Sequence, residues 1–227
     1  TAKFMIKNAD EIGQNNLALE FTTAKAVDTN VSIGLAALRS NSKIYIDWGD
    51  GEQKEYTVQT YISNYGGRQS GVIKGSKVKV YTAKGVQLKD IQLGQMEISE
   101  IDLTKSHALQ TLDLSRNALT EINFDGNRKL QQVTLDDNKL KDLTFLGHNY
   151  LQSISANQNE LETIEFNKSL GLTTLKVSNN KLQNINLGSM NMLAYFEANG
   201  NLLDKLDLSD CTELIDLRVR DNYLTEL

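Results

Sequence analysis

Residues 109–129 read LQTLDLSRNALTEINFDGNRK, and residues 130–150 repeat the pattern as LQQVTLDDNKLKDLTFLGHNY. Positions 1, 4, 6, 11, 14 and 16 of this unit are almost always apolar. Self-similarity with a fixed period is typical of a solenoid, in which each repeat buries its apolar face against its neighbours. The leucines that open the units are spaced by 21 residues without a slip: Leu88, Leu109, Leu130, Leu151, Leu172, Leu193 and Leu214.

Positions 4 and 6 of each unit alternate with polar residues, as in a half-buried strand. Stacked units therefore predict a parallel sheet with one strand per repeat, beginning near residues 90–93. After the strand the chain must turn inward, and an asparagine side chain offers both a donor and an acceptor for buried backbone groups. We therefore expect a structural ladder at position 9, formed by Asn117, Asn138, Asn159, Asn180, Asn201 and Asn222.

The remaining positions of the unit bring the chain back on the opposite, convex side. A 21-residue unit leaves too little chain for a full helix there, so we expect extended or 3₁₀ segments. The first unit departs from the pattern because Met96 occupies the ladder position. Such a departure suits an end unit, since terminal repeats are atypical.

The pattern LxxLxLxxNxL resembles the leucine-rich repeat, and the resemblance covers residues 88–227 as seven units, the last one partial. The short unit is similar to that of bacterial surface leucine-rich-repeat proteins, including the internalins. This resemblance implies a right-handed solenoid that acts as a binding module and not as an enzyme.

Residues 1–87 lack the 21-residue period and form a separate predicted domain. Asp50-Gly51 lies between two strand-like runs and predicts a type I′ hairpin. The polar, glycine-rich stretch Tyr61–Gly71 is interpreted as a loop. Several short strands separated by turn signals favour a β-sandwich. The predicted strands are Leu17–Phe21, Asn30–Leu35, Lys43–Trp48, Glu52–Val58 and Lys77–Tyr81.

The segment Ile46–Gly51, IDWGDG, resembles the signature of PKD-type immunoglobulin-like domains. Followed by GSKVKVY and then the repeats, it looks like a group of secreted or surface proteins from gut-dwelling anaerobic bacteria, in which a β-sandwich caps the first repeat. The resemblance implies a secreted or cell-surface location. We expect Lys77–Tyr81 to lie against the solenoid end and cover its sheet edge.

Composition excludes several classes of function. The chain is 40% hydrophobic and 23% charged, as in soluble globular proteins, and no apolar run approaches the roughly 20 residues of a membrane span. No basic stretch followed by an apolar run opens the sequence, so its first residues are not predicted to be a signal peptide. Residues 1–87 carry a net charge of +3 and residues 88–227 carry −8, so the solenoid would repel nucleic acid. Proline is absent, which fits a β-rich chain because each proline removes a backbone hydrogen-bond donor from a sheet.

Titratable residues give little sign of catalysis or metal binding. Asp47 and Asp50 could bind a cation together with Glu52, but the six to eight oxygens that calcium takes are not evident, and a hairpin turn is favoured. His107 and His148 fall on convex-side turns of different units, about 10 Å apart for strands near 4.8 Å, which makes them poor partners for a metal or a catalytic dyad.

The cysteine and one carboxylate pair also give little sign of chemistry. Cys211 is the single cysteine, so an internal disulfide and a cysteine zinc site are excluded, and a half-buried structural thiol is favoured. Glu197 and Asp216 should lie on adjacent strands, but nothing builds a deep pocket around them. We predict no catalytic residue, metal or cofactor.

Binding is expected on the concave face, where positions 3, 5 and 7 point outward. The middle of that face is small and polar, whereas its C-terminal end carries tyrosine and arginine, which are enriched at interface hot spots. Arg218 and Arg220 should form a local positive spot. The candidate binding residues are Lys176, Tyr195, Glu197, Asp216, Arg218 and Arg220.

Two functions remain open. The concave face could bind a protein or glycan at a cell surface, and the single exposed aromatic, Tyr195, tilts this reading toward a protein. Alternatively, the chain is a structural spacer or envelope component without a dedicated ligand. The sequence stops at Leu227 without an evident capping segment, so the last unit could also mediate self-association.

Overall fold

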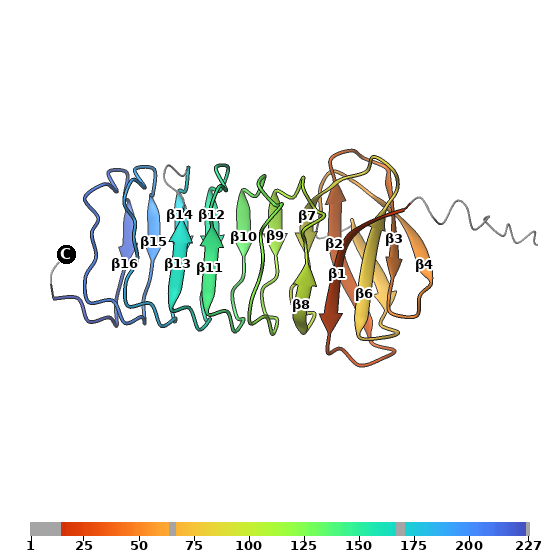
Figure 1. Ribbon diagram of the computed structural model, residues 1–227, viewed down its shortest axis with the longest axis horizontal. Coiled ribbons are helices and arrows are strands. Elements are labelled where there is room, and N and C mark those ends of the chain that lie inside the picture. Colours follow the sequence, from red (N-terminus) through yellow and green to blue (C-terminus); the bar gives the residue numbers. More distant parts are fainter. Residues whose placement is uncertain (1–14, 64–66, 167–170, 226–227) are drawn as a thin grey trace, which may run out of the picture.

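The computed structural model describes residues 15–63, 67–166 and 171–225, and every regular element in these ranges is a β-strand. The molecule is elongated, with an N-terminal pair of sheets at one end and a stack of repeats along the rest (Figure 1). The strands are β1 Asn16–Thr23, β2 Asn30–Ala37, β3 Ser42–Asp47, β4 Gln53–Val58, β5 Arg68–Val72, β6 Lys77–Thr82, β7 Leu88–Gln92, β8 Ile98–Asp102, β9 Thr111–Asp113, β10 Gln132–Thr134, β11 Asp142–Phe145, β12 Ser153–Ser155, β13 Thr163–Phe166, β14 Thr174–Lys176, β15 Tyr195–Glu197 and β16 Asp216–Arg218.

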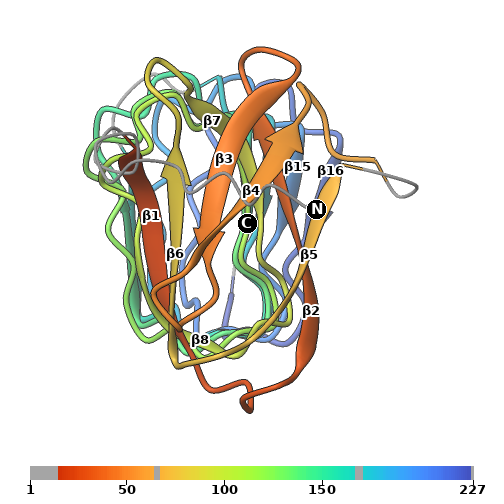
Figure 2. The ribbon, with the colours of Figure 1, turned by 90° about the vertical axis from the view of Figure 1, so that its right-hand side faces the viewer.

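The N-terminal part has two layers. The strands β1, β3, β4 and β6 belong to one antiparallel sheet, whereas β2 and β5 belong to another. Seen from this end, β1 and β6 lie on one side and β2 and β5 on the other (Figure 2). Alternate side chains of both layers, such as Phe21, Ile33, Ile46 and Val80, are fully buried between them. All five predicted strands are confirmed; the likeness to PKD-type domains stays a prediction.

The prediction of a loop over Tyr61–Gly71 was wrong for its C-terminal part, because β5 begins at Arg68 and pairs with β2. Gly71 sits inside this strand, where a Cβ atom would lie 2.0 Å from Cε2 of the Trp48 indole. The glycine therefore allows a strand to approach a ring closely, a role that glycine also takes in strands.

The β3–β4 connection also differs from the expected type I′ hairpin. Asp47 pairs with Gln53, so five residues, 48–52, form the loop. Only Gly49 and Gly51 have positive φ there, whereas a type I′ turn needs it at two consecutive central residues. Asp47 Oδ1 accepts hydrogen bonds from the amides of Gly49 at 2.8 Å and Gly51 at 2.9 Å. Asp47 thus stabilises the turn, in agreement with the hairpin interpretation that the sequence favoured over a cation site.

Both sheets continue from the N-terminal strands into the first repeat. In one sheet β2 pairs antiparallel with β7, and in the other β1 pairs antiparallel with β8. The edge of the parallel sheet is therefore covered by β2. Our expectation that Lys77–Tyr81 covers it was wrong, because that segment, β6, lies between β3 and β1, where Val78 and Val80 fill the sandwich core.

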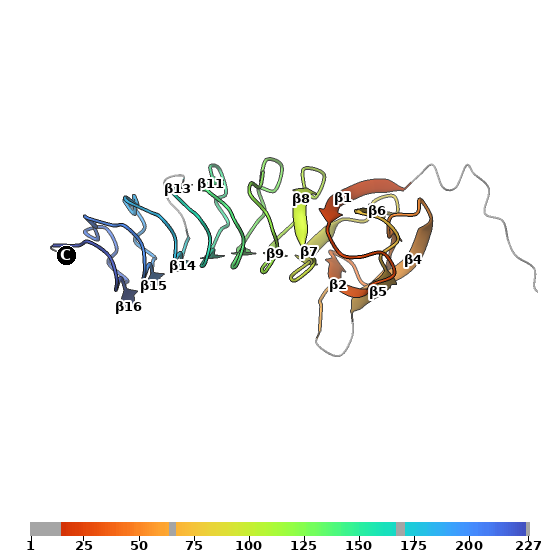
Figure 3. The same ribbon diagram turned by 90° about the horizontal axis from the view of Figure 1, so that it is seen from below.

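The repeats form the predicted parallel sheet. Each strand pairs in parallel with the next at a register of 21 residues, as in Asp90↔Thr111 and Thr174↔Tyr195. The strands lie along one side of the molecule and the return segments along the other (Figure 3). On the return side β8, β11 and β13 are extended. Neither an α-helix nor a 3₁₀ helix occurs in the described residues. The leucine-rich-repeat solenoid predicted from the period is confirmed.

The asparagine ladder is confirmed at all six positions. Asn159 is typical: its Nδ2 donates to the carbonyls of Leu135 (2.9 Å) and Ala156 (3.3 Å), and its Oδ1 accepts from the amide of Leu140 at 3.1 Å. At the first unit, Asn117 Oδ1 accepts from the amides of both Met96 and Ile98. The same side-chain bonds recur at Asn138, Asn180, Asn201 and Asn222.

A left-handed residue at position 8 completes each inward turn. Its φ lies between 55° and 64°, a region that costs most residues free energy but costs glycine little. Only one unit uses glycine there, so the varied residue types hid this requirement from sequence reasoning. The seven positions are Gln95, Arg116, Asp137, Gln158, Asn179, Gly200 and Asp221.

Candidate functional site

The surface that could bind a partner is the strand face, which we define as the outward side of β7, β9, β10, β12, β14, β15 and β16. Positions 3 and 5 of the repeats project from it, as predicted. Position 7 has a second role, because its side chains bond the backbone of the following repeat. The amides of Asn157, Ser178, Asn199 and Arg220 donate to the position-7 side chains of Asp136 (2.7 Å), Asn157 (2.8 Å), Ser178 (3.1 Å) and Asn199 (2.9 Å), respectively.

This second polar ladder was missed by sequence reasoning, which assigned position 7 to binding. We expect Asn157→Ala to lower the free energy of unfolding by about 1 kcal/mol, since the Ser178 amide would lose its acceptor. Chemical denaturation followed by circular dichroism measures the change, with Ser153→Ala on the same strand as the control. If Asn157→Ala is as stable as that control, the position-7 side chains do not stabilise the fold and remain candidates for binding.

The six predicted residues form a C-terminal patch on β14, β15 and β16. In the sheet register Tyr195 lies opposite Asp216, and Glu197 lies opposite Arg218 and Lys176. The Tyr195 side chain keeps 45% of its surface exposed, so its ring is open to a partner. The strands of units 6 and 7 are neighbours, as expected.

Ion pairs tie the charged members of the patch together. The Arg218 guanidinium donates from Nε to Asp216 Oδ1 (3.2 Å) and from NH2 to Asp216 Oδ2 (2.8 Å), and its NH1 lies 3.8 Å from Glu197 Oε1. Lys176 Nζ lies 3.2 Å from the same Glu197 oxygen. The hydrogen bonds to Asp216, with the nearby Glu197 charge, raise the pKa of Arg218. Glu197 and Asp216 are thus held by cations and do not form a free carboxylate pair.

Arg220 stands apart from the rest of the patch. It follows the end of β16, and its position in the unit is four residues beyond that of Tyr195. At about 3.3 Å per residue the two positions differ by about 13 Å along the strand direction. The patch therefore divides into a cluster around Tyr195 and Arg218 and a separate cation at Arg220.

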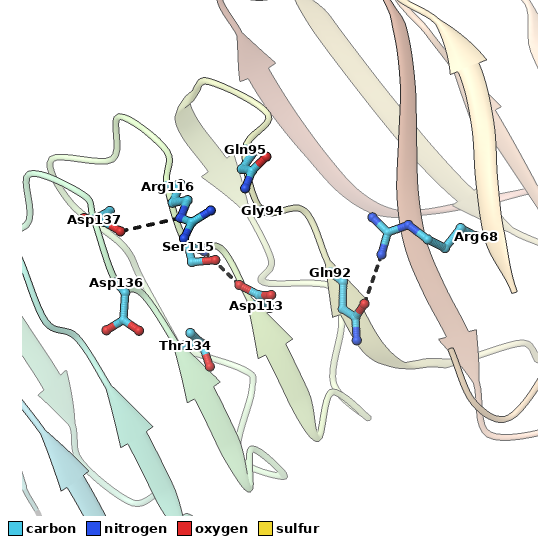
Figure 4. A pocket seen from close by; sticks show the side chains of 10 residues that line it. All are labelled: Arg68, Gln92, Gly94, Gln95, Asp113, Ser115, Arg116, Thr134, Asp136 and Asp137. Carbon is cyan, nitrogen blue, oxygen red and sulfur yellow. Dashed lines mark hydrogen bonds and ion pairs between the residues drawn. The ribbon is translucent and has the colours of Figure 1, made fainter. Parts of the chain in front are cut away.

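A hollow of about 390 Å³ lies at the opposite end of the strand face, next to the N-terminal sheets (Figure 4). Arg68 reaches it from β5 and donates to Gln92 Oε1 at 3.1 Å and to the Ser32 carbonyl at 2.8 Å. At Gly94, position 7 of the first unit, a Cβ atom would lie 3.2 Å from Ser115 Oγ. The lining is polar and of mixed charge: Arg68, Gln92, Gly94, Gln95, Asp113, Ser115, Arg116, Thr134, Asp136 and Asp137.

Sequence reasoning missed this hollow because it assigned Arg68 to a loop. Within the hollow Arg116 Nε lies 3.7 Å from Asp137 Oδ2, and Asp113 Oδ1 accepts from the Ser115 amide at 2.9 Å. Its polar groups could bind an equally polar surface. Among the described residues no cluster of three or more acidic, histidine or cysteine side chains could hold a metal ion.

Both histidines lie on return-side turns, as predicted. The exposed His107 places Nδ1 3.3 Å from the Gly126 carbonyl oxygen. His148 is buried. Cys211 is more buried than expected, and this burial raises the pKa of its thiol. In the described ranges no helix is long and apolar enough to cross a membrane.

No protein-family model and no curated protein sequence matches the chain. Among solved structures it is similar to the functional domain of InlJ from Listeria monocytogenes, which includes a cysteine ladder. The identity is 18%, the TM-score is 0.48, and the match covers 61% of this chain and 36% of the other. The assignment of a short-unit leucine-rich-repeat solenoid rests on this chain's own strand register and asparagine ladder.

Proposed function

We propose that this protein is a non-enzymatic binding module that holds a protein partner on its strand face, at a secreted or cell-surface location. The observation that carries the proposal is the cluster of Tyr195 and Arg218. Tyr195 is a large exposed side chain on a regular sheet, and Arg218 beside it is held in place by Asp216 and Glu197. A preoriented contact loses little conformational entropy when it binds.

The ion pairs refine the chemistry of the partner. Three cations and two carboxylates make up the patch, and the carboxylates already occupy Arg218 and Lys176. A partner carboxylate would therefore find at Arg220 an exposed cation that pairs with no carboxylate in the described part of the chain. Around Tyr195 the surface suits a flat contact with an apolar centre and hydrogen bonds at its rim, the arrangement typical of protein interfaces.

Replacing Tyr195 and Arg218 together by alanine is expected to abolish partner binding while lowering the free energy of unfolding by no more than about 1 kcal/mol, as surface changes do. Pull-down from host and bacterial surface extracts, followed by affinity measurement on the protein recovered, tests this. The matched control is Lys129→Ala with Tyr150→Ala, another exposed tyrosine with a lysine 4.4 Å above its ring. If both double variants lose binding equally, or if the Tyr195 and Arg218 variant loses none, the binding site does not lie at Tyr195 and Arg218.

Two alternatives give different results in the same experiments. A glycan-binding protein would bind on a glycan array and lose that binding in the Tyr195 variant. A structural spacer or envelope component would recover no specific partner in either extract. Self-association through the last repeat would appear as concentration-dependent sedimentation of the protein in the absence of any extract.

A further inference from the structure

A column of aromatic rings fills the return side of units 2 to 4. Phe124, Phe145 and Phe166 occupy position 16 and stack with ring centroids 5.2 Å and 6.3 Å apart. The imidazole of His148 meets Phe124 and Phe145 edge-on, at interplanar angles of 76° and 89°. Only 2% of the His148 surface is exposed. A titratable ring thus lies inside an apolar column. This column is part of neither polar ladder and is not part of the strand face.

The hydrogen bonding of His148 suits a neutral ring. Its Nε2 lies 3.3 Å from the carbonyl oxygen of Phe124, 24 residues earlier, and no partner for Nδ1 exists in the described part of the chain. Asn127 holds the same place in unit 2, where its Nδ2 donates to the Leu103 carbonyl, also 24 residues earlier, at 2.9 Å. His148 therefore repeats the asparagine bond with one N–H. An imidazolium would carry two N–H donors and need a second acceptor.

The charges near the ring also oppose protonation. Arg128, from the preceding return turn, donates to the carbonyl of Leu146 and pairs with the exposed Asp125 at 3.8 Å. Burial lowers the pKa of His148, and the Arg128 charge lowers it further; together they outweigh the raising effect of the backbone groups of Phe124, Phe145 and Leu146. No carboxylate within the described ranges bonds the ring.

We propose that the return turn of residues 146–150 is an acid-sensitive latch, closed by the neutral His148 ring and released when that ring is protonated. Release exposes Phe145, which the closed turn buries. The open turn presents an ordinary histidine with a pKa near 6.5. Since the closed form has the lower pKa, closure is unaffected above pH 6.5 and is weakened as the pH falls below it, by up to tenfold in open population for each unit of difference.

The chain has two histidines, so a proton NMR titration of the wild-type protein tests the first step. We expect His148 to titrate below the pKa near 6.5 of an ordinary histidine, and its signal to broaden or split as the turn opens. A His148 resonance that titrates with a pKa of about 6.5 or higher, while the fold stays intact, overturns the proposal without any substitution.

His148→Asn tests the second step, because Asn127 shows that asparagine fits this place and keeps the carbonyl bond. Amide exchange over residues 144–151, corrected for intrinsic rates, should be faster at pH 5 than at pH 7.5 in the wild type, by up to about tenfold for each unit by which closure lowers the pKa, and unchanged in His148→Asn. His107→Gln should behave as the wild type. Equal acceleration in wild type and His148→Asn, or none in the wild type, refutes the latch.

Discussion

Replacing Asn159 with alanine is expected to lower the free energy of unfolding by about 1–3 kcal/mol, the usual penalty for stranding buried polar groups. The residue is 9% exposed, and its side chain bonds the backbone of its own repeat and of the preceding repeat. The Leu135 and Ala156 carbonyls would keep a second donor, from Asn138 and Asn180 respectively. The Leu140 amide has no other acceptor among the described residues, so it carries most of the loss.

Urea denaturation followed by circular dichroism measures this change. The matched control is Asn184→Ala, which removes an exposed asparagine from a return segment and should change stability by less than about 0.5 kcal/mol. If both variants unfold at the same denaturant concentration, the ladder bonds are not worth more than those to water, and the inward turn is stabilised by packing alone.

Gly71→Ala is expected to destabilise the N-terminal sheets by about 1–3 kcal/mol, the range for overpacking a filled core. An added Cβ would lie 2.0–2.4 Å from three atoms of the Trp48 indole. The ring cannot turn away freely, because its Nε1 donates to the Tyr56 hydroxyl at 3.0 Å, which in turn donates to the Ser70 carbonyl at 2.8 Å. Relief of the clash must therefore break this chain or shift β5.

Trp48 is the single tryptophan, so its fluorescence reports directly on this site. We expect a red-shifted emission and a lower denaturation midpoint in Gly71→Ala. Ser70→Ala, on the adjacent exposed position of β5, leaves the carbonyl bonded by Tyr56 in place and should match the wild type. An unshifted emission with unchanged stability would show that β5 does not pack on the indole.

The repeat made the solenoid predictable in detail. Each leucine and asparagine in the period has one physical role, and the same role recurs in every unit, so errors at one position are corrected by the others. The N-terminal sheets have no such redundancy. There the glycine of β5 resembled a loop signal, and which strand covers the solenoid edge depended on pairing between β2 and β7, far apart in sequence.

The candidate site was predictable only in outline. The period places Tyr195, Glu197 and Arg218 on neighbouring strands, and the structure confirms that placement. Which cation pairs with which carboxylate depends on side-chain rotamers, which the period does not specify. The position-7 ladder was missed because serine, asparagine and aspartate are equally typical of a solvated face and of a backbone acceptor.

The sheet shared by β5, β2, β7 and the repeat strands has a mechanical consequence. The strands lie across the long axis of the molecule, so their mutual hydrogen bonds point along it (Figure 1). Tension between the two ends therefore pulls along these hydrogen bonds and does not shear them. The strand pairs bear the tension in series and can separate one after another. Each repeat that yields releases 21 residues, or about 70 Å of extended chain. Such a protein should lengthen under tension in equal steps.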